Sequence, residues 1–172
     1  PELTVIAAGG DGDGYAIGGG HLVHALKRNA SVLYILMNNA VYGLTKGQNS
    51  PTSGTAVDAV ADAPIDGVSM GLAIPGTTFL ARGFTRDADQ LNDLMTKALE
   101  HVRAKKGFAF LEVLSPCVTY NDTFPDWDAR VHNVDADPDY APNDRGAAFV
   151  KTMNLNSEGK IPTGLIYHED RP

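Results

Sequence analysis

The sequence predicts an open, doubly wound α/β fold built on a mostly parallel sheet. Two observations favour this class: short apolar runs alternate with helical patterns along the chain, and glycine-rich or polar segments follow directly where the apolar runs end. Of the 172 residues, 43% are hydrophobic and 20% are charged, which is typical of one globular core. We therefore expect one main domain.

The expected strands are the apolar runs. Residues 3–8, "LTVIAA", have no polar interruption and predict a strand buried on both faces of a parallel sheet. Residues 31–37, "SVLYILM", predict a second strand of this kind, and residues 77–82 and 108–114 predict a third and a fourth. Since a helical pattern separates the first two runs, they predict a right-handed parallel crossover.

Three segments predict helices. Residues 16–28 place apolar side chains at helical intervals and end at "KRN", which is typical of a helix C-terminus. Residues 66–73 predict a short helix. Residues 87–105 predict an amphipathic helix, with Gly107 placed to cap its C-terminus.

The remaining segments have little periodicity. Residues 43–64 are rich in Gly, Ser, Thr and Pro and predict a long ordered loop, a length that usually serves a function. Residues 118–172 carry many Asp, Asn and Pro and predict an extended tail, packed on the domain or on a partner subunit. We therefore divide the chain into an α/β domain over residues 1–117 and a tail over residues 118–172. Because a strand-like run starts just after Pro1, we expect the sequence to be part of a longer protein.

Charge and cysteine content exclude several classes of partner. The formal net charge is −7 and the sequence pI is about 5.0, so we expect no binding to nucleic acid or to an anionic membrane surface. The apolar runs are far shorter than the roughly 20 residues that span a bilayer. A single cysteine excludes an internal disulfide framework and favours a reducing, cytoplasmic location.

The stretch "GGDGDGYAIGGG" at residues 9–20 predicts a binding loop. It matches neither a P-loop, nor the dinucleotide fingerprint, nor an EF-hand. One interpretation is a tight turn whose aspartates cap the next helix. The other interpretation is a binding site, because Asp11 follows the first strand and Asn39 follows the second, and these strand ends lie at the same edge of a parallel sheet. A carboxylate and an amide oxygen there, beside glycine amides, suit Mg²⁺ bridged to a diphosphate.

The spacing of these residues resembles a known motif. "GDG" at residues 10–12, followed by 25 residues and then "NN" at 38–39, is similar to the thiamine diphosphate motif. The longer blocks "GGDGDGYAIGGGHLVHALKRN", "NNAVYGLTKGQNSPTS" and "FAFLEVLSPCVTYN" resemble the beta subunit of 2-oxoacid:ferredoxin oxidoreductases, and the resemblance runs through almost the whole chain. It implies a sheet of the thiamine diphosphate-binding type, shortened at its N-terminal side.

The resemblance implies a set of cofactor ligands. Mg²⁺ would be held by Asp11, by the side chain of Asn39 and by the backbone carbonyl of Val41, since hard oxygen donors suit this ion. If the alignment slips by two residues, Asp13 replaces Asp11; we prefer Asp11 because it sets Asn39 at the family's interval. The backbone amides expected to face the diphosphate are those of Gly12, Asp13, Gly43 and Leu44.

Two further residues gain a role from the resemblance. Lys46, in "TKGQ", would meet a substrate carboxylate or coenzyme A, unless it is simply an exposed loop lysine. Cys117, in "SPC", would ligate a [4Fe–4S] cluster, unless it is a small buried apolar side chain. Such a cluster takes four thiolates, and the other three lie upstream in relatives. The sequence given therefore supplies only one ligand.

The implied activity is oxidative decarboxylation of a 2-oxoacid to an acyl-CoA, with electrons passed to ferredoxin. "TKGQ" and "YND" favour 2-oxoglutarate or a broad range of 2-oxoacids. An alpha subunit is implied as partner, because it supplies the glutamate that activates the cofactor in the family. Two alternatives stay open: a non-oxidative thiamine diphosphate-dependent decarboxylase or carboligase, against which the cysteine argues, and a non-catalytic diphosphate-binding fragment.

Overall fold

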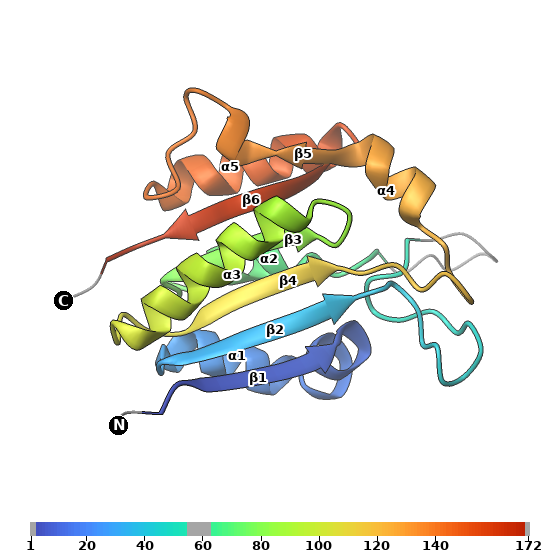
Figure 1. Cartoon of the computed structure of the whole chain (residues 1–172), viewed down its shortest axis with the longest axis horizontal. Helices are drawn as coiled ribbons and strands as arrows, with labels where there is room; N and C mark the ends of the chain where they lie inside the picture. The colour runs from blue at the N-terminus through green and yellow to red at the C-terminus, as the bar shows by residue number, and fades with distance from the viewer. Residues whose placement is uncertain (1–2, 55–62, 171–172) are drawn as a thin grey trace.

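A central sheet organises the molecule. The computed structural model describes residues 3–54 and 63–170, and within them six strands hydrogen-bond in the order β1-β2-β4-β3-β6-β5 (Figure 1). The strands are β1 (Val5–Gly10), β2 (Val32–Asn38), β3 (Phe79–Phe84), β4 (Ala109–Leu114), β5 (Val131–Asn133) and β6 (Ile161–His168).

Four neighbouring strands run in the same direction. β1, β2, β4 and β3 pair in parallel, and their register places Gly10 beside Met37 and Leu114 beside both Asn38 and Phe84. Their carboxyl ends therefore share one edge of the sheet, at the right of Figure 1. β6 pairs antiparallel with β3, and β5 pairs parallel with β6. The predicted doubly wound, mostly parallel α/β fold is confirmed.

Helices cover both faces of the sheet. One apolar cluster joins one face to α1 (Gly19–Arg28), α2 (Gly67–Leu72) and α5 (Arg145–Ser157), and a second joins the other face to α3 (Ala88–Arg103). A short α4 (Phe124–Arg130) lies near the carboxyl edge, where Trp127 packs with Phe84 and Leu114. The helices predicted before residue 105 are confirmed, with shorter ends. Across the described residues, no helix combines the length and apolarity needed to cross a membrane.

The first strand lies in a different environment from the one its sequence predicts. β1 is an edge strand of the sheet, and Val5 and Ile6 are 52% and 53% exposed. The prediction of a strand buried on both faces is therefore wrong for β1. An uninterrupted apolar run identifies a strand, but it carries no information on whether the strand is central or at an edge.

The C-terminal part of the chain is more regular than predicted. Residues 118–172 contain α4, β5, a 3₁₀ turn (Val134–Ala136), α5 and β6, so the expectation of an extended tail is wrong. The side chain of Asp144 caps α5 by accepting a hydrogen bond from the Ala147 amide at 2.9 Å. β6 packs this part of the chain onto the sheet through β3. The division at residue 117 stays a prediction.

The glycine-rich stretch is wound more tightly than an open loop. Asp13–Ile17 form a π-helical turn, and α1 starts only at Gly19, three residues later than predicted from the sequence. Turns of this type are frequent at functional sites. Of the long loop predicted over residues 43–64, residues 55–62 lie outside the described part of the chain.

His101 is a buried titratable group at the opposite end of the sheet from the glycine-rich stretch. Its Nε2 lies 3.0 Å from the Thr78 hydroxyl, and its Nδ1 has no hydrogen-bond partner among the described residues. Burial, followed by the neighbouring His168 and Lys106, lowers the pKa of His101 from 6.5 to about 4, while Asp170 opposes the shift. The folded chain therefore keeps this imidazole neutral.

This depressed pKa predicts an acid-sensitive fold. Below about pH 6.5 the unfolded chain binds a proton at His101 that the folded chain does not, so stability falls as the pH drops towards 4. We expect the midpoint temperature of unfolding to fall less over this range in His101→Gln than in the unmutated chain, by on the order of 5 °C. Thermal melts at several pH values measure this, with exposed His21→Gln as control. Equal pH dependence in all three proteins would contradict the assignment.

Candidate functional site

Asp11 is a buried carboxylate at the end of β1. Only 3% of the residue is exposed, and its Oδ2 accepts hydrogen bonds from Ser50 Oγ at 2.5 Å and from Thr52 Oγ1 at 2.6 Å. Both hydroxyls come from the loop that follows β2. Within residues 3–54 and 63–170, Asp11 takes part in no ion pair. In this part of the chain, the hydrogen bonds to its carboxylate come from hydroxyl groups alone.

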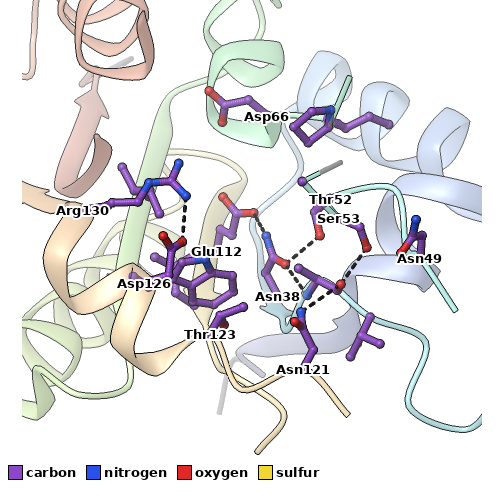
Figure 2. Close-up of a pocket in the computed structure, with 18 of the residues that line it drawn as sticks. Asn38, Asn49, Thr52, Ser53, Asp66, Glu112, Asn121, Thr123, Asp126 and Arg130 are labelled. Carbon is purple, nitrogen blue, oxygen red and sulfur yellow. Dashed lines mark hydrogen bonds and ion pairs between the residues drawn. The ribbon is translucent and has the colours of Figure 1, made fainter. Parts of the chain in front are cut away.

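Asn38, at the end of β2, extends this polar contact towards the centre of the sheet. Its Oδ1 accepts from the Ala40 amide at 3.1 Å and lies 2.8 Å from Thr52 Oγ1, while its Nδ2 donates to Glu112 Oε1 at 2.8 Å (Figure 2). Thr52 has a single hydroxyl proton for two close acceptors, Asp11 and Asn38. The Thr52 hydroxyl can therefore donate a full hydrogen bond to only one of these two oxygen atoms.

The other two predicted magnesium ligands lie in the next turn of chain. Asn39 Oδ1 accepts from the Val41 amide at 3.1 Å, a local turn that fixes the Asn39 side chain. The structure joins Asp11 to Asn38 through Thr52, and no hydrogen bond joins Asp11 to Asn39 directly. The proposed ligand set of Asp11, Asn39 and Val41 stays a prediction.

The predicted phosphate-facing residues come from both loops. A side chain at Gly12 would collide with the Tyr42 ring, since a Cβ there would lie 2.2 Å from Tyr42 Cε1, so the two loops pack closely at this point. Asp13 is exposed and its Oδ2 accepts from the Gly10 amide at 3.1 Å, which stabilises its own turn. Gly43 is partly exposed and Leu44 is exposed. Their contacts with a diphosphate stay predictions.

Lys46 lies in the exposed turn after β2. Its backbone amide donates to the Gly43 carbonyl at 3.1 Å, and its φ of 66° places it in the left-handed region. No ion pair of the Lys46 side chain occurs in the described part of the chain. The ammonium group is therefore available at the surface, and its contact with a substrate or coenzyme A stays a prediction.

Cys117 begins a turn that touches the loop after β2. The Asn121 amide donates to the Cys117 carbonyl at 2.8 Å, and the Asn121 side chain donates to the carbonyls of Asn39 and Ala40 at 3.1 and 3.2 Å. Cys117 itself is half-buried and forms no disulfide. The structure thus brings the predicted cluster ligand and the predicted magnesium loop into one hydrogen-bonded unit.

The donor chemistry at this edge fits a hard cation. Asp11 Oδ2, the hydroxyls of Ser50 and Thr52, and Asn38 Oδ1 are oxygen donors that lie close together, and the carboxylate lacks a cationic partner. Mg²⁺ prefers such donors. The described residues contain no group of three or more His, Cys, Asp or Glu side chains arranged for a metal. The predicted site has only one such side chain, so it would depend on amide, carbonyl and diphosphate oxygens.

A cavity of about 640 Å³ opens beside the Asn38–Val41 turn (Figure 2). Its floor includes Glu112 and Arg82 on the sheet, and α4 forms one wall. Asp126 and Arg130 on that wall form an ion pair at 2.8 Å. Asp11 does not line the cavity, which is instead bordered by Ala40, Val41 and Thr52 of the loop after β2.

A buried ion cluster under this cavity was missed by the sequence analysis. Arg82 Nε lies 2.6 Å from Glu112 Oε2, and the Arg82 guanidinium also pairs with Asp66. Burial alone would raise the pKa of Asp66, but Arg82 and the hydrogen bonds from Ser69 and other neighbours lower it to about 2. The available signal was one charged residue inside each of two apolar runs, "FLARGF" and "AFLEVL". Ser50 and Thr52 gave no such signal.

Comparison with known proteins places the chain in a family. Residues 1–113 match the family described as "Thiamine pyrophosphate enzyme, C-terminal TPP binding domain". The chain belongs to the thiamine pyrophosphate enzymes. Residues 117–172 match a second family, which describes the C-terminal part of the pyruvate ferredoxin oxidoreductase beta chain. The thiamine diphosphate-binding type of fold predicted from the motifs is confirmed.

Curated relatives make the likeness more specific. The beta subunit of a 2-oxoacid:ferredoxin oxidoreductase from Saccharolobus solfataricus is 37% identical, with 99% of this chain and 59% of the relative aligned. A 2-oxoglutarate synthase subunit KorB from Methanocaldococcus jannaschii is 39% identical, covering 100% and 63%. The predicted resemblance to these beta subunits is confirmed. The chain spans less than two thirds of the length of either relative.

A solved structure has the same fold. The 2-oxoglutarate:ferredoxin oxidoreductase from Magnetococcus marinus, with 2-oxoglutarate, coenzyme A and succinyl-CoA bound, superposes with a TM-score of 0.86 at 36% sequence identity. The match covers 100% of this chain and 59% of that chain. The likeness therefore includes the C-terminal strands as well as the glycine-rich stretch.

Proposed function

We propose that this chain is part of the beta subunit of a 2-oxoacid:ferredoxin oxidoreductase, and that Asp11 and the loop after β2 hold Mg²⁺ and thiamine diphosphate. The observation that carries the proposal is the buried Asp11 carboxylate, which meets oxygen atoms of the neighbouring loop without a cation to balance it. The matches to thiamine pyrophosphate enzymes and to ferredoxin oxidoreductase beta subunits support it.

Within this proposal the protein supplies position and charge. When bound, thiamine diphosphate would supply the nucleophilic carbon and the electron sink that decarboxylation of a 2-oxoacid requires. Asp11, Asn39 and the Val41 carbonyl would hold the Mg²⁺ ion, and the amides of Gly12, Asp13, Gly43 and Leu44 would face the diphosphate. The alpha subunit would complete the site, and coenzyme A would accept the acyl group.

Cys117 would connect this site to redox chemistry. Its turn is hydrogen-bonded to the Asn39–Ala40 backbone through Asn121, so a [4Fe–4S] cluster held there would lie next to the cofactor loop. Electrons would leave one at a time through that cluster to ferredoxin. A role for this cysteine in a cluster would favour the redox enzyme over a non-oxidative decarboxylase or carboligase, and turnover in the assembled enzyme would separate it from a non-catalytic diphosphate-binding fragment.

Cofactor affinity tests the proposed magnesium site. In the assembled enzyme, Asp11→Ala and Asn39→Ala are expected to raise the dissociation constant for thiamine diphosphate at fixed Mg²⁺ by at least about tenfold, since each removes a direct ligand. Isothermal titration measures this, and circular dichroism checks the fold. Asp13→Ala is the control for the alternative alignment. If Asp13→Ala alone abolishes binding, Asp13 is the ligand; unchanged affinity in all three contradicts the site.

Cluster content tests the role of Cys117. In the full complex, Cys117→Ser is expected to abolish most of the broad visible absorption of the iron–sulfur cluster and the reduction of ferredoxin, while thiamine diphosphate still binds. Thr119→Ser, an exposed change in the same turn, is the matched control. An intact cluster in Cys117→Ser would contradict the assignment. Ferredoxin reduction by the enzyme with substrate also excludes the non-oxidative alternative.

A substrate panel tests Lys46 and the choice of 2-oxoacid. We expect 2-oxoglutarate to be accepted, and Lys46→Ala to raise its KM by about tenfold, because an exposed cation would pair with the distal carboxylate. Lys46→Arg keeps the charge and should retain most of the affinity. A rise in the KM for coenzyme A alone would assign Lys46 to that ligand instead. Unchanged values for both would identify an exposed loop lysine with no role in binding.

A further inference from the structure

Two opposite charges lie side by side in the middle of the sheet. Arg82 on β3 and Glu112 on β4 are register partners, and they are 5% and 1% exposed. The Arg82 Nε–Glu112 Oε2 distance is 2.6 Å. Burying such a pair is costly, and a pair of apolar residues would often be at least as stable in its place. Packing alone therefore does not explain why these charges are here.

The second oxygen of Glu112 contacts both segments of the proposed cofactor site. Tyr15, in the π-helical turn after β1, donates its hydroxyl to Glu112 Oε1 at 3.0 Å. Asn38, at the end of β2, donates its amide to the same oxygen at 2.8 Å. One carboxylate thus uses Oε2 to bind Arg82 and Oε1 to hold the two loops.

The contact with Glu112 also determines which way the Asn38 amide points. Because Nδ2 donates to Glu112, Oδ1 must face the Ala40 amide and the Thr52 hydroxyl. Thr52 in turn contacts Asp11. Reversing the Asn38 amide would set two donors against each other at Ala40. A continuous chain of contacts therefore runs from Arg82 through Glu112, Asn38 and Thr52 to Asp11, part of which is drawn in Figure 2.

We propose that Glu112 is a positioning residue for the cofactor site: by accepting from Tyr15 and Asn38 on one oxygen, it fixes the turn that follows Asp11 against the loop that carries Asn39 and Val41. The role of Arg82 is to orient Glu112 by donating to its other oxygen, Oε2. This inference rests on the proposed function for its ligand, but the fixing of the two segments against each other does not depend on any cofactor.

The informative variant is Glu112→Gln. A glutamine has one acceptor oxygen where glutamate has two, so it cannot accept from Arg82 on one side and from Tyr15 and Asn38 on the other. The charged guanidinium is the stronger donor and takes the oxygen, which leaves the glutamine amide facing the Asn38 amide. The side chain keeps its size, so the sheet keeps its packing.

Asp66→Asn is the matched control. It removes a carboxylate from the same ion cluster and the same partner, Arg82, but Asp66 hydrogen-bonds to neither Tyr15 nor Asn38. Because the pKa of Asp66 is lowered to about 2, this variant is expected to lose stability at neutral pH. Tyr15→Phe is a milder test, since it removes a single hydroxyl.

The affinity experiment uses the enzyme assembled with its partner subunit. Glu112→Gln is expected to raise the dissociation constant for thiamine diphosphate with Mg²⁺ by about tenfold, with little change in the KM for the 2-oxoacid at saturating cofactor. Asp66→Asn is expected to leave that dissociation constant unchanged. Tyr15→Phe should raise it less, and should add nothing in the Glu112→Gln background. Unchanged affinity in Glu112→Gln, or equal losses in Glu112→Gln and Asp66→Asn, would overturn the proposal.

Hydrogen exchange separates this inference from the proposed function. Without cofactor, Glu112→Gln is expected to speed amide exchange in segments 11–18 and 38–53, while Asp66→Asn does not. If the unmutated enzyme fails to bind thiamine diphosphate, the proposed function fails, and this exchange pattern still decides whether Glu112 fixes the two segments. If the exchange pattern is absent, the positioning role is wrong even if the cofactor binds.

Discussion

The parallel register of β1, β2, β4 and β3 is the constraint on which the rest of the structure depends. It brings the carboxyl ends of four strands to one edge, so that three separate loops meet: the glycine-rich turn, the loop after β2 and the turn that begins at Cys117. Ligands of open α/β sheets bind at such edges. Residues more than 100 positions apart in the sequence, such as Asp11 and Cys117, therefore lie in loops that both contact the loop after β2.

Charge is distributed unevenly over this site. Among the residues that the structure describes, Asp11 accepts hydrogen bonds only from hydroxyl groups, whereas Glu112 and Asp66 share the Arg82 guanidinium. The buried Arg82 thus pairs with the carboxylates of Glu112 and Asp66, and it forms no ion pair with Asp11. In a low-dielectric surrounding, an unpaired carboxylate strongly favours a bound cation. The same polar chain that joins the two regions through Asn38 and Thr52 contains no second cationic side chain.

The sequence was sufficient for the features that follow from local patterns. Apolar runs identified the first four strands, helical spacing identified α1 to α3, and the rule about strand ends placed Asp11 and Asn39 on neighbouring loops. The edge position of β1 was not predictable in this way, because exposure depends on which strands are neighbours. α5 was missed because its buried positions, Ala148, Thr152 and Leu155, include only one large apolar side chain.

The polar network that joins Arg82 to Asp11 could not be predicted from local sequence patterns. Arg82 and Glu112 are 30 positions apart, and their meeting depends on the register of β3 and β4. Ser50 and Thr52 lie in an irregular loop with no periodicity to indicate which way they face. Such contacts depend on the folded sheet, and Arg82, Glu112, Ser50 and Thr52 were not among the residues that the family resemblance supplied.

The position of β6 determines when Arg82 becomes shielded from water during folding. β6 pairs with β3 and sets Gly164 beside Arg82, and its Pro162 carbonyl lies 3.4 Å from the guanidinium. Until residues 161–168 have been synthesised and have docked, β3 lacks its neighbour on that side and Arg82 stays accessible to water. Water would weaken the attraction of Arg82 for Glu112, so the strength of this ion pair depends on a strand that lies about 80 positions further along the sequence.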